Sequence, residues 1–206
     1  MRAEFKFATL SSAFAAALIV MAGTATAAGT PERVRGTIAS LEGPKMVVHG
    51  QDGKDVTVML DAKLGVAGVI KASLADIKPG VFIGTATTDA PGSVLQSVEV
   101  VVFPPAMKGV GEGHYPWDLP GANKMTNATV ATDVKGVDGQ TVTVKYKGGE
   151  KKIKIPAHIP IVTLVPGSTA DLHVGESVFV PGLRQPDGTV QAAHVLYGKD
   201  GVTPPM

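Results

Sequence analysis

The chain has 206 residues, among them 19 basic and 18 acidic side chains, 25 glycines, 15 prolines and no cysteine. The lack of cysteine excludes disulfides and thiolate metal sites, and the near-neutral charge gives no indication of binding to nucleic acid or to an acidic membrane. Frequent glycine and proline predict many turns and disfavour long helices.

Residues 1–27 have the features of a signal peptide. Arg2 and Lys6 give a positive start, residues 7–23 form an apolar run, and Ala25 and Ala27 are the small residues that a signal peptidase recognises. The run is short for a bilayer anchor, so an uncleaved anchor is the weaker alternative. We expect export by the general secretory route, cleavage near Ala27 and a periplasmic mature chain. Two of the 19 basic and one of the 18 acidic residues would be removed, which leaves 17 of each.

The rest of the chain contains an internal repeat. Residues 74–80 recur as residues 169–175, an offset of 95 positions. Extending the match in both directions gives two copies, residues 33–103 and residues 127–197.

Each copy predicts a series of short strands. In the second copy Val142 and Val144 alternate with polar residues, two glycines turn the chain, and Ile153 and Ile155 alternate with lysines. This period of two indicates a hairpin with one apolar face. Five or six such strands per copy favour a small closed barrel, because closure removes exposed edges. We predict an all-β protein of two tandem barrels resembling oligonucleotide/oligosaccharide-binding domains. A two-sheet sandwich per copy is the alternative.

A Pro/Gly-rich linker, residues 104–126, separates the copies, and residues 198–206 form a C-terminal tail. The linker holds four prolines, four glycines and the single tryptophan of the chain. A loop of this length is either a tether or a functional element. Tyr115, Trp117 and Leu119 argue against a free tether, because aromatic side chains usually pack against something.

The linker also holds a cluster of chemically versatile side chains: Glu112, His114, Tyr115, Trp117 and Asp118. Two carboxylates, an imidazole and two aromatic rings could form a cofactor or hard-metal site. We favour a structural interpretation, in which Trp117 fills the seam between the barrels while Asp118 and His114 satisfy backbone groups.

A soft metal site is a further possibility. His114 could join Met107 and Met125 as a ligand of copper or haem, although packing is the commoner use of methionine. None of the five histidines has a partner at a spacing that places two imidazoles on one face of a strand or helix.

Four lysines share one face of the second copy's hairpin: Lys145, Lys147, Lys152 and Lys154. They could bind a polyanion or an acidic partner. They could also protect a strand edge against aggregation, which is the interpretation that we favour. The matching positions of the first copy lack lysine and are Val47, His49, Thr57 and Met59.

The chain resembles exported proteobacterial proteins with two tandem barrel domains of unknown function. Residues 112–118, 125–130 and 204–206 carry this resemblance, together with the Ala-Asp turns at Asp76 and Asp171. The resemblance implies a fold and a compartment but no activity. Proteins of this appearance are often labelled metal-transporter permeases, a label that the sequence contradicts because no apolar span follows the signal.

We therefore expect an exported, non-catalytic binding or adaptor protein of the periplasm, whose ligand and cofactors, if any, the sequence does not identify. Its partner would be another periplasmic or membrane-anchored protein rather than nucleic acid. The alternative is a metal- or haem-handling protein that uses His114 and nearby methionines. An enzyme is not expected, because no serine lies in a nucleophile-elbow pattern and most aspartates occupy turns.

Overall fold

The computed structural model describes residues 29–119, 121–136 and 138–205. The expected signal peptide, with its cleavage site near Ala27, lies outside these residues. Strands and short 3₁₀ turns make up the regular structure of the described chain, and none of its helical turns is long and apolar enough to cross a membrane. The prediction of an all-β protein is confirmed.

Five strands close into a ring that we call the second barrel. They are β5 (Phe82–Thr88), β6 (Val94–Val102), β8 (Ala122–Gly136), β9 (Gly139–Tyr146) and β10 (Gly149–Pro156). The order β5–β6–β10–β9–β8 returns to β5, with antiparallel contacts except in the parallel pair β6–β10. A small closed barrel, as the strand pattern predicted, is therefore present.

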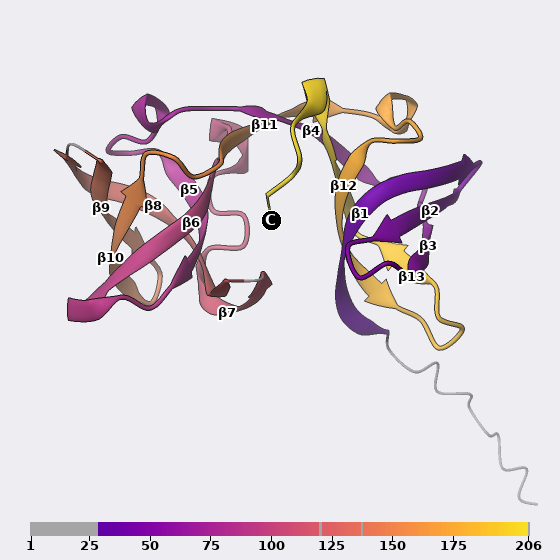
Figure 1. The fold of residues 1–206 in the computed structure, drawn as a ribbon, viewed down its shortest axis with the longest axis horizontal. Coiled ribbons are helices and arrows are strands. Elements are labelled where there is room, and N and C mark those ends of the chain that lie inside the picture. The colour runs from indigo at the N-terminus through magenta and orange to yellow at the C-terminus, as the bar shows by residue number, and fades with distance from the viewer. Residues whose placement is uncertain (1–28, 120, 137, 206) are drawn as a thin grey trace, which may run out of the picture.

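A second set of five strands closes in the same way into the first barrel. These strands are β1 (Thr30–Glu42), β2 (Lys45–Gly50), β3 (Asp55–Met59), β12 (Ser177–Arg184) and β13 (Val190–Ala192). Their order β1–β2–β3–β13–β12 returns to β1, and only the pair β3–β13 is parallel. The two barrels lie side by side in Figure 1.

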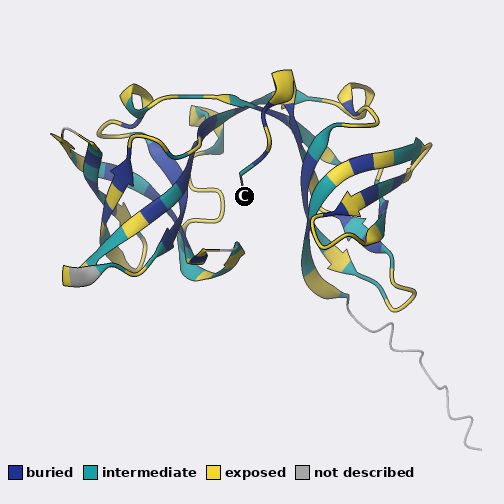
Figure 2. Cartoon of the chain, viewed as in Figure 1, coloured by how far each residue is buried: buried dark blue, intermediate teal, exposed yellow. Residues whose placement is uncertain are grey.

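Alternation of side chains builds both barrels. In β9 the buried Val142 and Val144 alternate with threonine and lysine, and in β10 the buried Ile153 and Ile155 alternate with exposed lysines. Figure 2 shows the resulting bands of buried and exposed residues along the strands. Apolar residues on the inner faces fill each barrel, because that is where period-two strands can exclude water.

The expectation that each copy forms one barrel is not met, because each copy contributes strands to both barrels. Residues 33–103 supply β1 to β3 of the first barrel but β5 and β6 of the second. Residues 127–197 supply most of β8 together with β9 and β10 to the second barrel, and β12 and β13 to the first. Each copy therefore crosses from one barrel to the other, and each core contains residues of both copies.

Two strands make these crossings, β4 (Gly65–Lys71) and β11 (Ile161–Gly167). They pair with each other in antiparallel register, from Val162 opposite Lys71 to Gly167 opposite Val66. On its other side β4 pairs with β14 (His194–Gly198), and β11 pairs with β6. Figure 1 shows this bridge spanning the top of the molecule. Strands β4 and β11 thus lead each copy from one barrel to the other and pair with each other between them.

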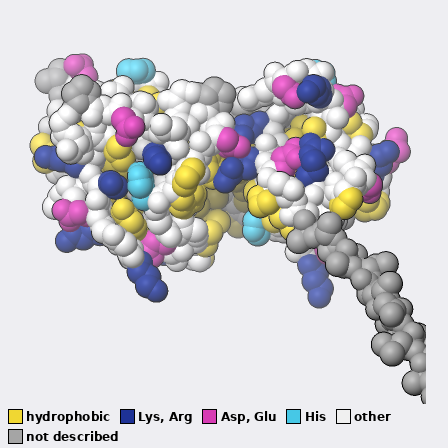
Figure 3. Space-filling view, turned by 90° about the horizontal axis from the view of Figure 1, so that it is seen from below, with side chains coloured by type: hydrophobic (Ala, Val, Ile, Leu, Met, Phe, Trp, Pro, Cys, Tyr) yellow, Lys and Arg dark blue, Asp and Glu magenta, His cyan; other side chains and the backbone are white. Residues whose placement is uncertain are grey.

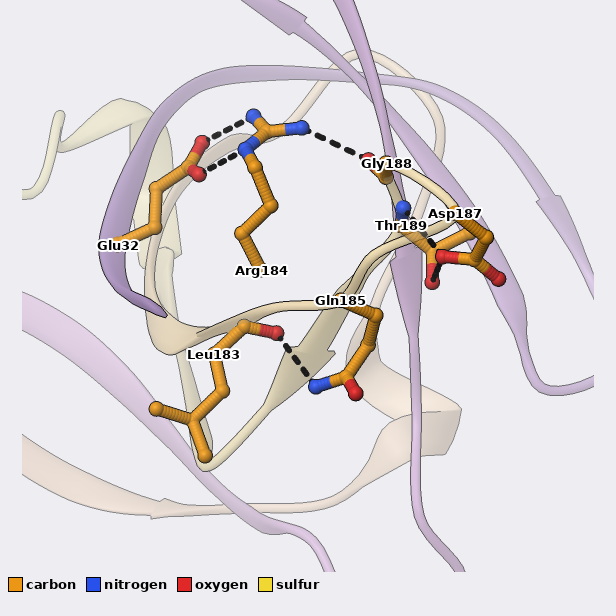
Figure 4. A network of polar contacts seen from close by, with 7 residues as sticks. All are labelled: Glu32, Leu183, Arg184, Gln185, Asp187, Gly188 and Thr189. Atoms are coloured by element: carbon orange, nitrogen blue, oxygen red, sulfur yellow. Dashed lines mark hydrogen bonds and ion pairs between the residues drawn. The ribbon is translucent and has the colours of Figure 1, made fainter. Parts of the chain in front are cut away.

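A polar network ties the start of β1 to the end of β12 (Figure 4). Arg184 makes a two-pronged ion pair with Glu32, and its Nη1 donates to the carbonyl oxygen of Gly188 at 2.7 Å. Asp187 accepts from the backbone N–H and the hydroxyl of Thr189 at 2.9 and 2.8 Å. These bonds fix the turn between β12 and β13 and hold strands from the two copies in register.

The expected linker is ordered structure. It contains a 3₁₀ turn, η3 (Pro105–Met107), and a strand, β7 (Gly113–Leu119), that pairs with the first half of β8. The remaining short turns are η1 (Leu74–Asp76), η2 (Pro91–Ser93), η4 (Thr169–Asp171) and η5 (Lys199–Gly201). The tail returns between the barrels, where Val202 and Pro204 are buried (Figure 1).

Candidate functional site between the barrels

Trp117 fills the seam between the two barrels. It projects from β7, beside the second barrel, and packs against Phe179 of the first barrel with ring centroids 6.3 Å apart. The guanidinium carbon of Arg33 lies 4.0 Å from the indole centroid and that of Arg35 lies 5.9 Å away. A cation over an indole face is attracted to the ring's negative charge density. This contact between β7 and β1 is the arrangement that the structural interpretation of the linker predicted.

We had expected Asp118 to satisfy backbone groups, but in the structure it pairs with the side chains of two arginines. Its carboxylate lies 2.9 Å from Arg35 and 3.4 Å from Arg33. Burial by itself would raise the pKa of Asp118, but the hydrogen bond and charge of Arg35, together with those of Arg33, lower it overall. The side chain is therefore charged at neutral pH, and it links β7 to β1 across the seam.

Glu99 is a buried acid that sequence reasoning missed. It lies opposite Ala86 on the outer face of β6, is only 1% exposed, and neither carboxylate oxygen has a hydrogen-bond partner among the described residues. The Nε1 of Trp117 is likewise buried without a partner there. Burial raises the pKa of Glu99 to about 8, although the charge of Arg35 opposes the rise. The one signal in the sequence was a lone acid in the valine-rich stretch of β6.

His114 lies on the face of β7 opposite to Trp117. Its Nδ1 is 2.8 Å from the hydroxyl of Thr126, and its ring stacks on Tyr146 with centroids 6.3 Å apart. Burial lowers the pKa of His114, and the positive charges of Lys151 and Lys124 lower it further. The imidazole is therefore neutral at pH 7 and is held by a side chain.

The rest of the linker cluster does not converge on one point. The backbone N–H of Lys147 donates to Glu112 at 3.0 Å, on the outer side of the second barrel. The hydroxyl of Tyr115 accepts from the amide of Asn127 at 3.2 Å, and its ring meets Trp117 edge-on. Tyr115 and Trp117 thus belong to the seam, whereas Glu112 and His114 do not.

The residues predicted as soft-metal ligands are also not brought together. Met125 is buried opposite Tyr115, so it lies on the other face of the β7–β8 pair from His114. Met107 lies in η3 and packs against apolar residues between the barrels. Within residues 29–205 as described, no three His, Cys, Asp or Glu side chains are grouped so that they could hold a metal ion.

The four lysines of the hairpin are all exposed, three on the outer face of β9 and β10 and Lys147 in the turn between them. None of them forms an ion pair within the described part of the chain. The edge-protection interpretation is wrong, because β9 pairs with both β8 and β10, and β10 pairs with both β9 and β6. These strands have no edge to protect, and the lysines form an unpaired basic face.

An apolar cleft of about 620 Å³ lies between the barrels, beneath the bridge. Strands β4, β11 and β14, one residue of β12 and the loop around η3 line it. Its apolar lining includes Phe103, Met107, Val110, Leu164, Val165 and Leu196. Figure 3 shows hydrophobic side chains gathered in the hollow between the two lobes. Sequence reasoning missed this cleft because its walls come from five separate segments of the chain.

No family model matches the chain, and neither curated proteins nor solved structures give a match. Its class is therefore defined by its own structure: an all-β protein of closed five-stranded barrels with an apolar cleft between them.

Proposed function

We propose that this chain is an exported, non-catalytic binding protein and that the cleft between the barrels is its binding site. The cleft is the observation that carries the proposal. Binding sites for small molecules are concave, measure about 300 to 1,000 Å³ and are lined mainly by apolar side chains with a few polar groups. The cleft of about 620 Å³ has these properties, with His194 as a polar group in its lining.

The arrangement of titratable groups supports binding over catalysis. An acid and a base that act on one substrate must lie within reach of the same atoms. Glu99 and His114 have shifted pKa values, but Glu99 is sealed in the seam and His114 lies on the other side of β7. Neither of them lines the cleft.

We also infer that the barrels descend from one duplicated unit of the oligonucleotide/oligosaccharide-binding type. The 3₁₀ turns η1 and η4 occupy corresponding places in the two copies and begin with the same serine–aspartate hydrogen bond. The hydroxyl of Ser73 donates to the carboxylate of Asp76, and that of Ser168 donates to the carboxylate of Asp171, each at 2.8 Å. Irregular pairing also occurs at corresponding places, after Ile38 in β1 and after Val130 in β8. The resemblance to exported two-domain barrel proteins and the sequence of residues 1–27 support a periplasmic location.

Binding of a neutral apolar fluorophore tests the proposed site. We expect N-phenyl-1-naphthylamine to bind the mature protein with enhanced fluorescence. Val110, which is 50% exposed and lines the cleft, gives the test variant Val110→Asp. A charge in the cleft should weaken binding about tenfold, because desolvating a carboxylate opposes burial of an apolar ligand.

Val174→Asp is the matched control, because Val174 is 63% exposed and does not line the cleft. This variant should bind the fluorophore as the unaltered protein does. Equal weakening by both substitutions, or no saturable binding to the folded protein, would refute the proposed site.

A further inference from the structure

The floor of the cleft has little to offer a ligand that needs hydrogen bonds. Val66 and Ala67 of β4 lie in it, and their strand pairs on one side with β11 and on the other with β14. The backbone N–H and C=O groups of β4 are therefore used within the sheet. A peptide cannot add to β4 as a further strand, because β-augmentation requires a free edge.

The walls of the cleft suit a flexible aliphatic chain. Most of the lining is aliphatic or proline, and Phe103 supplies the one carbocyclic ring among the described residues that form it. That ring already packs against Phe82 with centroids 5.4 Å apart. Sugars and nucleobases are usually held between aromatic faces and by convergent hydrogen bonds, neither of which this lining provides. An alkyl chain needs only contact with apolar surface.

The charged groups beside the cleft favour an anion. Among the described residues no carboxylate lines it, and the one titratable residue of the lining is His194. Lys108 directly follows Met107 in the wall loop, is exposed, and has no ion pair among the described residues. Asp118, an acid of the seam, is already paired with two arginines. The cleft thus combines an apolar interior with an exposed lysine, without an ion pair among the described residues, next to its wall.

From these observations we propose that the ligand is a single-chain amphiphile with an anionic head group, of the chemical class of long-chain fatty acids. The alkyl chain lies along β4, β11 and β14, and the head group meets Lys108 and His194 at the rim. This proposal rests on the proposed function, because it names the ligand class of the same cleft.

Displacement of N-phenyl-1-naphthylamine by three C16 compounds at submicellar concentration tests the ligand class. These are hexadecanoate, hexadecanol and hexadecyltrimethylammonium, which share a chain length and differ in head-group charge. We expect hexadecanoate to displace the fluorophore at the lowest concentration and the cationic compound at the highest. Lys108→Glu should weaken hexadecanoate about fivefold, as expected for an exposed ion pair, and leave hexadecanol unchanged. Lys45→Glu, which alters an exposed lysine of β2 away from the cleft, should change neither.

The outcomes separate this inference from the proposed function. If the fluorophore binds but hexadecanol displaces it as well as hexadecanoate does, and Lys108→Glu has no effect, the anionic head group is refuted while the apolar site stands. If the fluorophore binds and no C16 compound displaces it, the ligand class is refuted. If the fluorophore does not bind the folded protein at all, both proposals fail.

Discussion

Glu99 shows how a single residue couples the seam to pH. Its carboxyl group is buried without a hydrogen-bond partner among the described residues. In the ionised form, neither water nor a hydrogen-bond donor would stabilise its negative charge. The pKa therefore rises from the ordinary value of 4.5 to about 8, with burial as the main cause. Between these two pH values the folded protein retains a proton that the unfolded chain has lost, so the free energy of unfolding must fall as pH rises.

We predict that Glu99→Gln removes this dependence. The stabilising contribution of the neutral carboxyl is complete below about pH 4.5 and is lost as pH rises to about 8. From pH 5 to pH 9 the unaltered protein should therefore lose roughly 3 to 5 kcal/mol of unfolding free energy relative to the glutamine variant. Urea denaturation followed by circular dichroism at pH 5, 7 and 9 measures this difference.

Glu42→Gln provides the control, because Glu42 is an exposed acid at the end of β1. Its unfolding free energy should follow that of the unaltered protein at each pH. If the Glu99→Gln curve also runs parallel to that of the unaltered protein, Glu99 does not titrate in the seam as proposed.

Local sequence predicts the strands of this protein well and their partners poorly. The alternation around Val142 and Ile153 correctly predicted a hairpin and its buried face. The same pattern could not show that β10 also pairs with β6, because that contact joins segments about 60 residues apart. For this reason the lysines were wrongly assigned to an edge. The position of Trp117 in the seam was predictable, because a large aromatic side chain in a long loop usually packs against something. The cleft was not predictable, because it depends on the crossing of β4 and β11.

The lysine face of the second barrel leads to a prediction of its own. Its four exposed lysines lack ion pairs among the described residues, so they are free to meet an acidic partner. We expect the protein to be retained on immobilised polyglutamate at low salt and released as salt increases. Lys152→Gln combined with Lys154→Gln should lower the salt concentration of elution.

The control for the lysine face removes the same charge from the first barrel. Lys45→Gln combined with Lys54→Gln alters exposed residues at its β2–β3 hairpin, where Lys54 lies 3.9 Å from Asp52. Elution of this variant should stay close to that of the unaltered protein. Equal shifts for the two double variants would show that net charge, and not the lysine face, governs retention.

The crossing of strands makes the two barrels depend on each other. The core of the first barrel joins Val48 of β2 to Val180 of β12, and that of the second joins Val144 of β9 to Ile83 of β5. Unfolding residues 33–103 would therefore remove strands from both barrels at once. The seam around Trp117 and the paired strands β4 and β11 add direct contacts between the barrels.

We predict that this arrangement unfolds in one cooperative transition, unlike two independent domains. Val48 and Val144 are fully buried at corresponding places in the two cores, each opposite the strand irregularity of its barrel. Val48→Ala and Val144→Ala should each cost roughly 2 kcal/mol, by loss of buried methyl groups and creation of a cavity. Because the cores share both copies, each substitution should shift the same single midpoint in urea, whether followed by circular dichroism or by Trp117 fluorescence. Two separated transitions, with each substitution moving only one of them, would show that the barrels unfold independently in spite of their shared strands.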